Sequence, residues 1–163
     1  MTTTSAVPSN RTLHLIDLEN LVGDPRAGSP LVHETLTRFL RVARWRAGDH
    51  VIVASNPRLM EHVVFDPPVP WSAHATCGPD GADLMLLSLS PPELVVRRYA
   101  RLVVGSGDGI FASRANAARD LGVDVLVVAR AGGCSRRLRT FPHVLLFAPK
   151  PDPDPDPPLV LAA

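Results

Sequence analysis

Hydrophobic residues along the chain form short runs that alternate with stretches of helical spacing. Four runs rich in valine, leucine and isoleucine have the length and continuity of strands that are buried on both faces. Two weaker runs fit the same alternation, one of them bracketed by prolines and Gly78. The predicted strands are residues 13–18, 51–55, 73–77, 101–106, 123–130 and 143–147.

The stretches between these runs predict helices. The first is predicted where apolar residues recur every three or four positions, at Val32, Leu36, Phe39, Leu40 and Ala43. A second should run from Gly81 to before Pro91, and Ser90-Pro91-Pro92-Glu93 predicts the capping box of a short third helix. A fourth is predicted over residues 110–121, with Gly122 ending it.

Alternating strands and helices predict right-handed βαβ units and hence a parallel sheet. We therefore predict a single α/β domain, a doubly wound and mainly parallel sheet flanked by helices, as in Rossmann-like folds. The length of 163 residues suits one such domain. Residues 12–148 should form it, after a flexible leader (residues 1–11) and before a disordered tail (residues 149–163) in which proline and aspartate alternate.

The composition of the chain argues against several classes of protein. Hydrophobic residues make up 45% of the chain but aromatic residues only 5%, which favours a helix-covered sheet over a platform that stacks nucleobases. The polar amino terminus lacks the apolar stretch of a signal peptide, and no run approaches the roughly 18 apolar residues of a membrane span. Cys77 and Cys134 have neither CxxC nor zinc spacing, as is typical of reduced thiols. We expect a cytoplasmic protein that does not enter a membrane.

Charge is unevenly distributed, although the formal total is only +1. Of the 17 basic and 16 acidic residues, the tail holds Lys150 and three aspartates, which leaves 16 basic and 13 acidic residues elsewhere, a formal charge of +3. Those basic residues are all arginine, whose planar fork binds phosphate in bidentate fashion. Nucleic-acid binding is thus permitted, although a GC-rich genome would give the same arginine-rich composition.

Acidic residues stand where the predicted strands end. Asp17 closes the first strand, Asp108 follows the fourth, and Asp80 and Asp83 begin the helix between them. Open α/β sheets bind ligands at the carboxyl ends of their strands, so these residues are candidates for chemistry. Each acid alone could simply cap a helix. Together they would repel one another, and a divalent cation such as Mg²⁺ would relieve that repulsion.

Several motifs resemble those of a known family. IDLEN (residues 16–20), GAD (81–83) and SGDGIF (106–111) are similar in order and spacing to NYN domains of the PIN-like nuclease superfamily, as are the Gly122-Val123 step and CSRRLR (134–139). The similarity extends over residues 13–147. It implies a PIN-like fold and a metal-dependent endoribonuclease that hydrolyses RNA phosphodiester bonds.

The resemblance also implies roles for individual residues. Asp17, Asp83 and Asp108 would be catalytic, as ligands of Mg²⁺ or Mn²⁺ or by positioning the attacking water. Asn20 would orient the first carboxylate, Ser106 would form a hydrogen bond near the site, and both would bind the substrate. RNA is the implied partner; a homo-oligomer stays open.

One position departs from the family pattern. Where such domains carry a second acid after SGD, this chain has Ile110, which cannot bind a metal. Asp80 or Glu19 could supply the missing carboxylate. The alternative is a catalytically decayed RNA-binding or regulatory PIN-like module. A small-molecule phosphohydrolase fits less well, because the first strand lacks the DxDx[TV] end of phosphoaspartate enzymes.

Four arginines follow the fifth predicted strand, around Gly132-Gly133. We predict that this loop, and Arg136 and Arg137 in particular, contacts the phosphates of a bound substrate. The alternative is a solvated surface loop. Ser135 is a candidate cap for the short helix that follows. The four arginines are Arg130, Arg136, Arg137 and Arg139.

Overall fold

A computed structural model of the chain describes residues 10–146 and 161–162, so the predictions for the leader up to residue 9 and for most of the tail lie outside the described residues. All six predicted strands are confirmed, each within two residues at its ends. A further short strand, which the sequence did not predict, pairs with the sixth. The strands are β1 (Thr12–Asp17), β2 (His50–Ser55), β3 (Ser72–Ala75), β4 (Arg101–Gly105), β5 (Asp124–Arg130), β6 (His143–Leu146) and β7 (Leu161–Ala162).

The strands form one sheet in the order β3-β2-β1-β4-β5-β6-β7, in which the first six run parallel and β7 runs antiparallel to β6. The predicted doubly wound α/β fold is therefore confirmed. The order of the six parallel strands is that of Rossmann folds, and the winding reverses between β1 and β4. Because Ile16 pairs with Gly105, the segments that leave these two strands begin side by side at the carboxyl edge.

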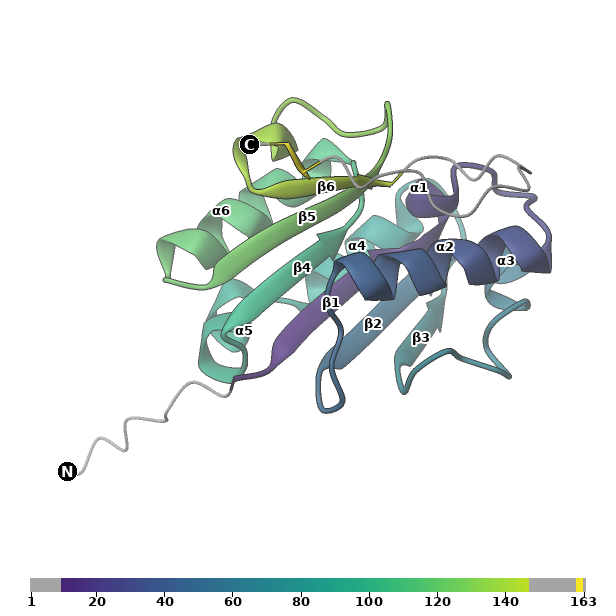
Figure 1. The fold of residues 1–163 in the computed structure, drawn as a ribbon, viewed down its shortest axis with the longest axis horizontal. Coiled ribbons are helices and arrows are strands. Elements are labelled where there is room, and N and C mark those ends of the chain that lie inside the picture. Colours follow the sequence, from purple (N-terminus) through teal and green to yellow (C-terminus); the bar gives the residue numbers. More distant parts are fainter. Residues whose placement is uncertain (1–9, 147–160, 163) are drawn as a thin grey trace.

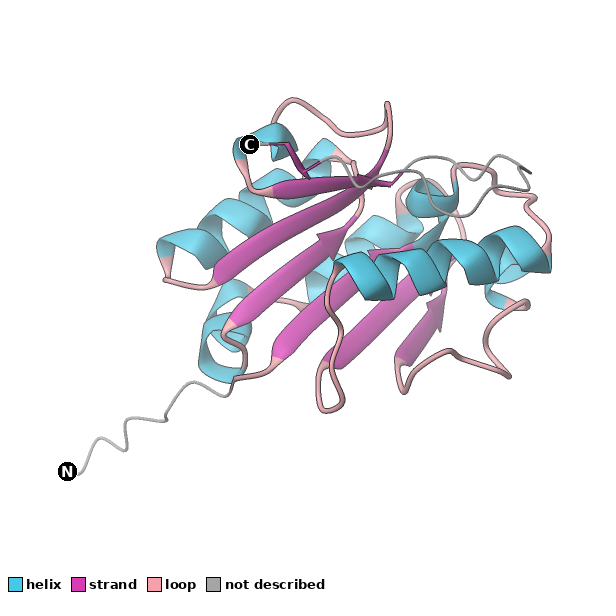
Figure 2. Ribbon diagram, in the orientation of Figure 1, coloured by secondary structure: helices cyan, strands magenta, loops and turns pink. Residues whose placement is uncertain are grey.

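Helices cover both faces of the sheet (Figures 1 and 2). Helices α1, α2 and α3 pack on one face in a core with residues such as Val53, and α4, α5 and α6 pack on the other with residues such as Val104. The helices are α1 (Leu18–Val22), α2 (Ser29–Val42), α3 (Pro57–Met60), α4 (Gly81–Leu89), α5 (Pro92–Arg98) and α6 (Ala112–Asp120), with short 3₁₀ turns η1 (Gly109–Phe111) and η2 (Leu138–Thr140).

Helix α2 follows the apolar spacing that predicted it. The five predicted core residues are all buried, which contributes roughly 1.5–3 kcal/mol for each large side chain. Its Phe39 presses on the sheet at Gly105, where an added Cβ would lie 2.6 Å from the ring carbon Cε2. Glycine at position 105 is therefore what lets the helix approach β4 so closely.

Two predicted caps are wrong. Ser90 does not begin α5, because Pro91 occupies that position and the Ser90 hydroxyl instead donates to the Leu86 carbonyl at the end of α4. That carbonyl lies in the last turn of α4 and would otherwise lack a partner. Ser135 does not cap η2 either: its hydroxyl oxygen is buried and has no hydrogen-bond partner among the described residues.

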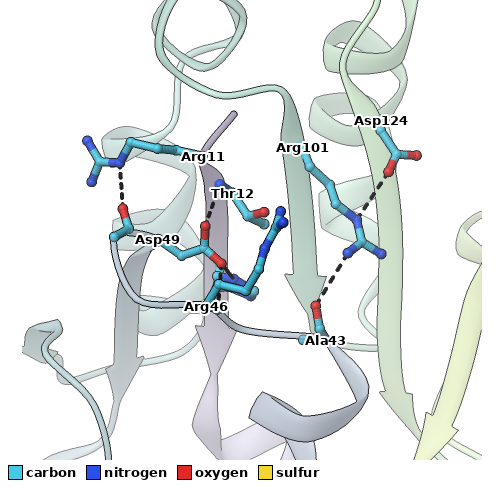
Figure 3. A network of polar contacts seen from close by, with 9 residues as sticks. Arg11, Thr12, Ala43, Arg46, Asp49, Arg101 and Asp124 are labelled. Carbon is cyan, nitrogen blue, oxygen red and sulfur yellow. Dashed lines mark hydrogen bonds and ion pairs between the residues drawn. The ribbon is translucent and has the colours of Figure 1, made fainter. Parts of the chain in front are cut away.

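Asp49 organises the opposite, amino-terminal edge of the sheet (Figure 3). Its carboxylate accepts hydrogen bonds from the Thr12 and Arg46 amides, each 2.9 Å long, and lies 3.2 Å from His14 Nε2. Arg11 donates from Nε to the Gly48 carbonyl, 2.6 Å away. The turn between α2 and β2 is thereby tied to the start of β1.

Two smaller findings bear on the expectations from composition. None of the described helices is long and apolar enough to cross a membrane. Cys77 is exposed and Cys134 is buried, and both are free thiols.

Candidate active site

An open cleft of about 660 Å³ lies at the carboxyl edge of the sheet, where the segments that follow β1 and β4 separate. Its walls come from the ends of β1 and β5, from α1 and the loop after it, and from the residues that follow β2 and β4. The loop before α4 and the first turn of α4 complete them. Five acidic residues line it: Asp17, Glu19, Asp80, Asp83 and Asp108. The cleft therefore gathers the acids that the sequence placed at strand and helix ends.

Asp17 is fixed at the end of β1. The side chain is only 5% exposed, its Oδ1 caps α1 by accepting from the Asn20 amide at 3.2 Å, and its Oδ2 accepts from the Ser106 hydroxyl at 3.0 Å. The capping role considered from the sequence is thus real. The cap uses only one hydrogen bond to Oδ1, and the carboxylate has further lone pairs that can accept other partners.

Asp83 meets Asp17 from the first turn of α4. Burial, then the charge and hydrogen bond of Asp17, then the charges of Asp108 and Asp80 raise the pKa of Asp83 to about 7. Burial also raises the pKa of Asp17, although hydrogen bonds from Asn20, Asp83 and Ser106 oppose that rise. Asp83 is therefore the carboxyl that keeps its proton and donates it to a hydrogen bond with Asp17. Such a carboxyl pair is typical of functional sites.

Asp108 lies on the neighbouring loop but is turned differently. It is exposed, its Oδ1 accepts from the Ile110 amide at 2.9 Å, and its own amide donates to Ser106 Oγ at 3.1 Å. Asp17 and Asp108 thus follow adjacent strand ends, as predicted. Within residues 10–146 no three His, Cys, Asp or Glu side chains are gathered tightly enough to hold a metal ion. The sharing of one cation by Asp17 and Asp108 stays a prediction.

Asn20 and Gly107 lock the loops that carry these residues. Asn20 holds Asp17 through its backbone amide, while its side-chain oxygen accepts from the Gly107 amide at 2.8 Å. An added Cβ at Gly107 would lie 1.9 Å from the Gly133 carbonyl oxygen, and the Gly107 carbonyl accepts from Ser135 N at 2.8 Å. Only glycine lets the loops after β4 and β5 pack this closely.

The pair Asp17–Asp83 fits a small divalent cation. Mg²⁺ commonly binds proteins through one or two carboxylates, with water and substrate oxygens completing its shell. Asp83 is 7% exposed, and its Oδ1 has no hydrogen-bond partner among the described residues. A buried carboxyl oxygen without a partner costs roughly 1–3 kcal/mol, which a bound cation would offset.

Asp80 and Glu19, the two acids that could replace the carboxylate missing at position 110, both line the cleft. Ile110 is 36% exposed and does not line the cleft. Asp80 lines it from a left-handed backbone conformation (φ 54°) and helps raise the pKa of Asp83. Glu19 also lines it, but its Oε2 accepts from Asn56 Nδ2 at 2.9 Å. Asp80 is the freer of the two replacements.

The arginine loop divides into two parts. Arg136 and Arg137 are exposed and do not line the cleft, although Arg137 Cδ lies 3.7 Å from a Cβ built at Gly109, beside Asp108. Arg139 donates from Nε to the Cys134 carbonyl. Arg130, by contrast, lines the cleft as the final residue of β5. The position of Arg130 at the end of a strand distinguishes it from the other three arginines of this segment, and that position could be read from the sequence.

Asn56 and Thr76 also line the cleft, and sequence reasoning missed both. Asn56 follows β2, so the strand-end argument applies to it as well. It caps α3 by accepting from the Leu59 amide at 3.0 Å. Thr76 lies in the loop after β3 and donates to the Ser55 carbonyl, and nothing in its sequence context marks it.

Comparisons of the chain with models of protein families, with curated proteins and with solved structures find no match. The resemblance to NYN domains therefore rests on the motifs and their spacing.

Proposed function

We propose that this protein is a metal-dependent endoribonuclease that hydrolyses RNA phosphodiester bonds with Mg²⁺ or Mn²⁺ held by Asp17 and Asp83. The observation that carries the proposal is the pair of buried carboxyls in contact at the switch point of the sheet, in which Asp83 Oδ1 has no hydrogen-bond donor among the described residues. A purely structural pair would be expected to use its oxygens within the fold.

The residues divide the chemistry between them. When bound, the cation would supply charge neutralisation at a phosphate and activation of water. Asp17 is held in one orientation by Asn20 and Ser106, which prepares its oxygens for a ligand. Asp108 caps η1 through Oδ1, a bond that does not need Oδ2. That second oxygen can orient a water molecule for attack or bind the cation through water.

RNA as the substrate is supported by three features. The cleft is open, which suits a polymer better than a small molecule, and arginines stand in and beside it. The order and spacing of the IDLEN, GAD and SGDGIF motifs resemble those of a family that cleaves or binds RNA. Cytoplasmic location follows only from the sequence and is part of the proposal.

A binding-only RNA or regulatory module is the second candidate, and a specific observation favours it. Ile110 stands where the NYN domains that this sequence resembles carry an acid, and the neighbouring Asp108 uses an oxygen for a cap. A site with fewer free carboxylates binds a cation less tightly. Such a protein would bind RNA without cleaving it.

Cleavage of a labelled single-stranded RNA separates the two candidates. The wild type should cleave with Mn²⁺ and not with chelator, and Asp108→Asn should lower the rate at least about tenfold. Asparagine caps as well as aspartate, so the fold should remain intact, as circular dichroism would verify. A wild type that is inert with Mn²⁺ but binds the RNA would replace the nuclease with the binding module.

A further inference from the structure

Arg130 is the one basic residue that lines the cleft within the described part of the chain. It ends β5, and its side chain extends to Gly23 at the end of α1, a helix that packs against β5. The same cleft holds the acids Asp17, Asp83 and Asp108. A lone cation in an acidic cleft would ordinarily pair with one of them.

Gly23 makes room for this arginine, and Gly133 lies beside it. A Cβ built on Gly23 would lie 2.4 Å from Arg130 Nε and 2.6 Å from Cζ, and one built on Gly133 would lie 3.7 Å from a terminal guanidinium nitrogen. Gly23 also ends α1 in a left-handed conformation with φ 74°. Two features therefore favour glycine at position 23: the left-handed backbone conformation, and the Arg130 guanidinium that occupies the space of a side chain.

Among the described residues the guanidinium has no protein partner. Arg130 Nε is buried and makes no hydrogen bond within the described residues, and none of the ion pairs found among those residues involves Arg130. A buried donor without a partner is costly, so a fold that keeps one in a cleft leaves it for a ligand. An arginine fork matches the oxygens of a phosphate.

We propose that Arg130 is a substrate-binding residue that holds a phosphate of the RNA on the side of the cleft opposite the Asp17–Asp83 pair. This inference rests on the proposed function, because the phosphate would then lie between the arginine and the cation at the carboxyls. Arg130 thereby fixes where the RNA strand crosses the carboxyl edge of the sheet, beside the acidic residues. Arg136 and Arg137 are exposed and lie outside the cleft, so they attract RNA through their charge without holding a particular phosphate.

Binding can be measured without cleavage by fluorescence anisotropy of a fluorescein-labelled, mixed-sequence single-stranded RNA in Ca²⁺. Ca²⁺ neutralises carboxylates but coordinates them more loosely and at longer distance than Mg²⁺. Arg130→Ala should weaken binding at least about tenfold, since it removes a charged hydrogen-bonding group. Arg130→Lys keeps the charge but loses the fork, so it should recover only part of the affinity.

Two further variants sharpen the test. Arg97→Ala removes an equal charge from an exposed position of α5, away from the cleft lining, and should change the affinity less than about twofold. Gly23→Ala keeps every charge but puts a Cβ where the guanidinium lies, so it should reproduce most of the loss seen with Arg130→Ala. Circular dichroism would check that this variant folds.

The outcomes are distinct from those of the cleavage assay. A wild type that cleaves RNA while Arg130→Ala binds as tightly as wild type would overturn this inference alone. Equal losses for Arg130→Ala and Arg97→Ala, or no binding by the wild type, would also overturn it. A wild type that binds through Arg130 but never cleaves would overturn the nuclease and leave the phosphate site standing.

Discussion

Asp83→Asn should stabilise the metal-free protein by about 2 kcal/mol at pH 8 while removing its response to divalent cations. The pKa of Asp83 is raised to about 7, mainly by burial and by Asp17, so at pH 8 the fold must hold two buried carboxylates in contact. The amide keeps the shape and can donate to Asp17 as the protonated acid does. It lacks the charge that a cation requires.

The sign of the pH dependence follows from the direction of that shift. Because the folded pKa lies above the unfolded value of 3.8, the contribution of Asp83 to stability is fully present below about pH 4. It is lost as the pH rises through about 7. Denaturant unfolding in chelator from pH 5 to 8.5 should therefore show the gap between variant and wild type widening with pH.

Asp80→Asn is the matched control. It removes a carboxylate from the same cleft, but Asp80 is exposed, and asparagine also tolerates the left-handed backbone there. Its effect should be much smaller. Adding Mn²⁺ should raise the unfolding temperature of the wild type and of Asp80→Asn but leave Asp83→Asn unchanged. An Asp83→Asn variant that is less stable than wild type at pH 8 would show that the carboxyl pair serves the fold.

Asp49→Ala should destabilise the protein by about 3 kcal/mol. The substitution leaves the Thr12 amide and the His14 imidazole without their acceptor, and His14 is wholly buried. It also frees the turn that the Arg46 amide holds (Figure 3). The control is Asp124→Ala, which removes the exposed ion pair with Arg101 and should cost less than about 1 kcal/mol.

The Asp49 network should also fail in acid. Burial lowers the pKa of His14, so its stabilising effect is present above pH 6.5 and is lost as the pH falls through the folded value. Burial opposes ionisation of Asp49, but hydrogen bonds from Thr12, Arg46 and His14 outweigh it and lower its pKa, so its contribution is lost at still lower pH. Thermal unfolding at pH 7.5 and pH 5 would measure this. Equal stability of Asp49→Ala and Asp124→Ala at pH 7.5 would contradict the account.

The sheet was predictable because its strands are continuous apolar runs, and α2 because a 14-residue helix shows its period clearly. Helices α1 and α3 were missed because five and four residues are too few to show one. Their starts are set instead by Asp17 and Asn56, whose side chains cap them. The capping box at Ser90 failed because a buried turn offered its hydroxyl a carbonyl of α4.

Only the part of the candidate site that depends on strand order could be predicted from the sequence. Two acids that follow neighbouring strands must lie near each other, so Asp17 and Asp108 share an edge. The contact between Asp17 and Asp83 depends on how α4 packs across the sheet, which local patterns do not encode. The position of Arg130 depends on Gly23, which is distant in the sequence. Long-range packing therefore decides which polar residues face the cleft.

The most direct test of the central claim is a crystal structure of the wild-type protein grown at pH 8 with Mn²⁺, read from its anomalous scattering. A manganese peak within coordinating distance of both the Asp17 and Asp83 carboxylates is the predicted result, because a cation relieves the repulsion between them. Asp83 Oδ1, which has no hydrogen-bond donor in the described part of the chain, should be one of its ligands. A map with no manganese at this pair, and with the two carboxyls still hydrogen-bonded to each other, would contradict the account.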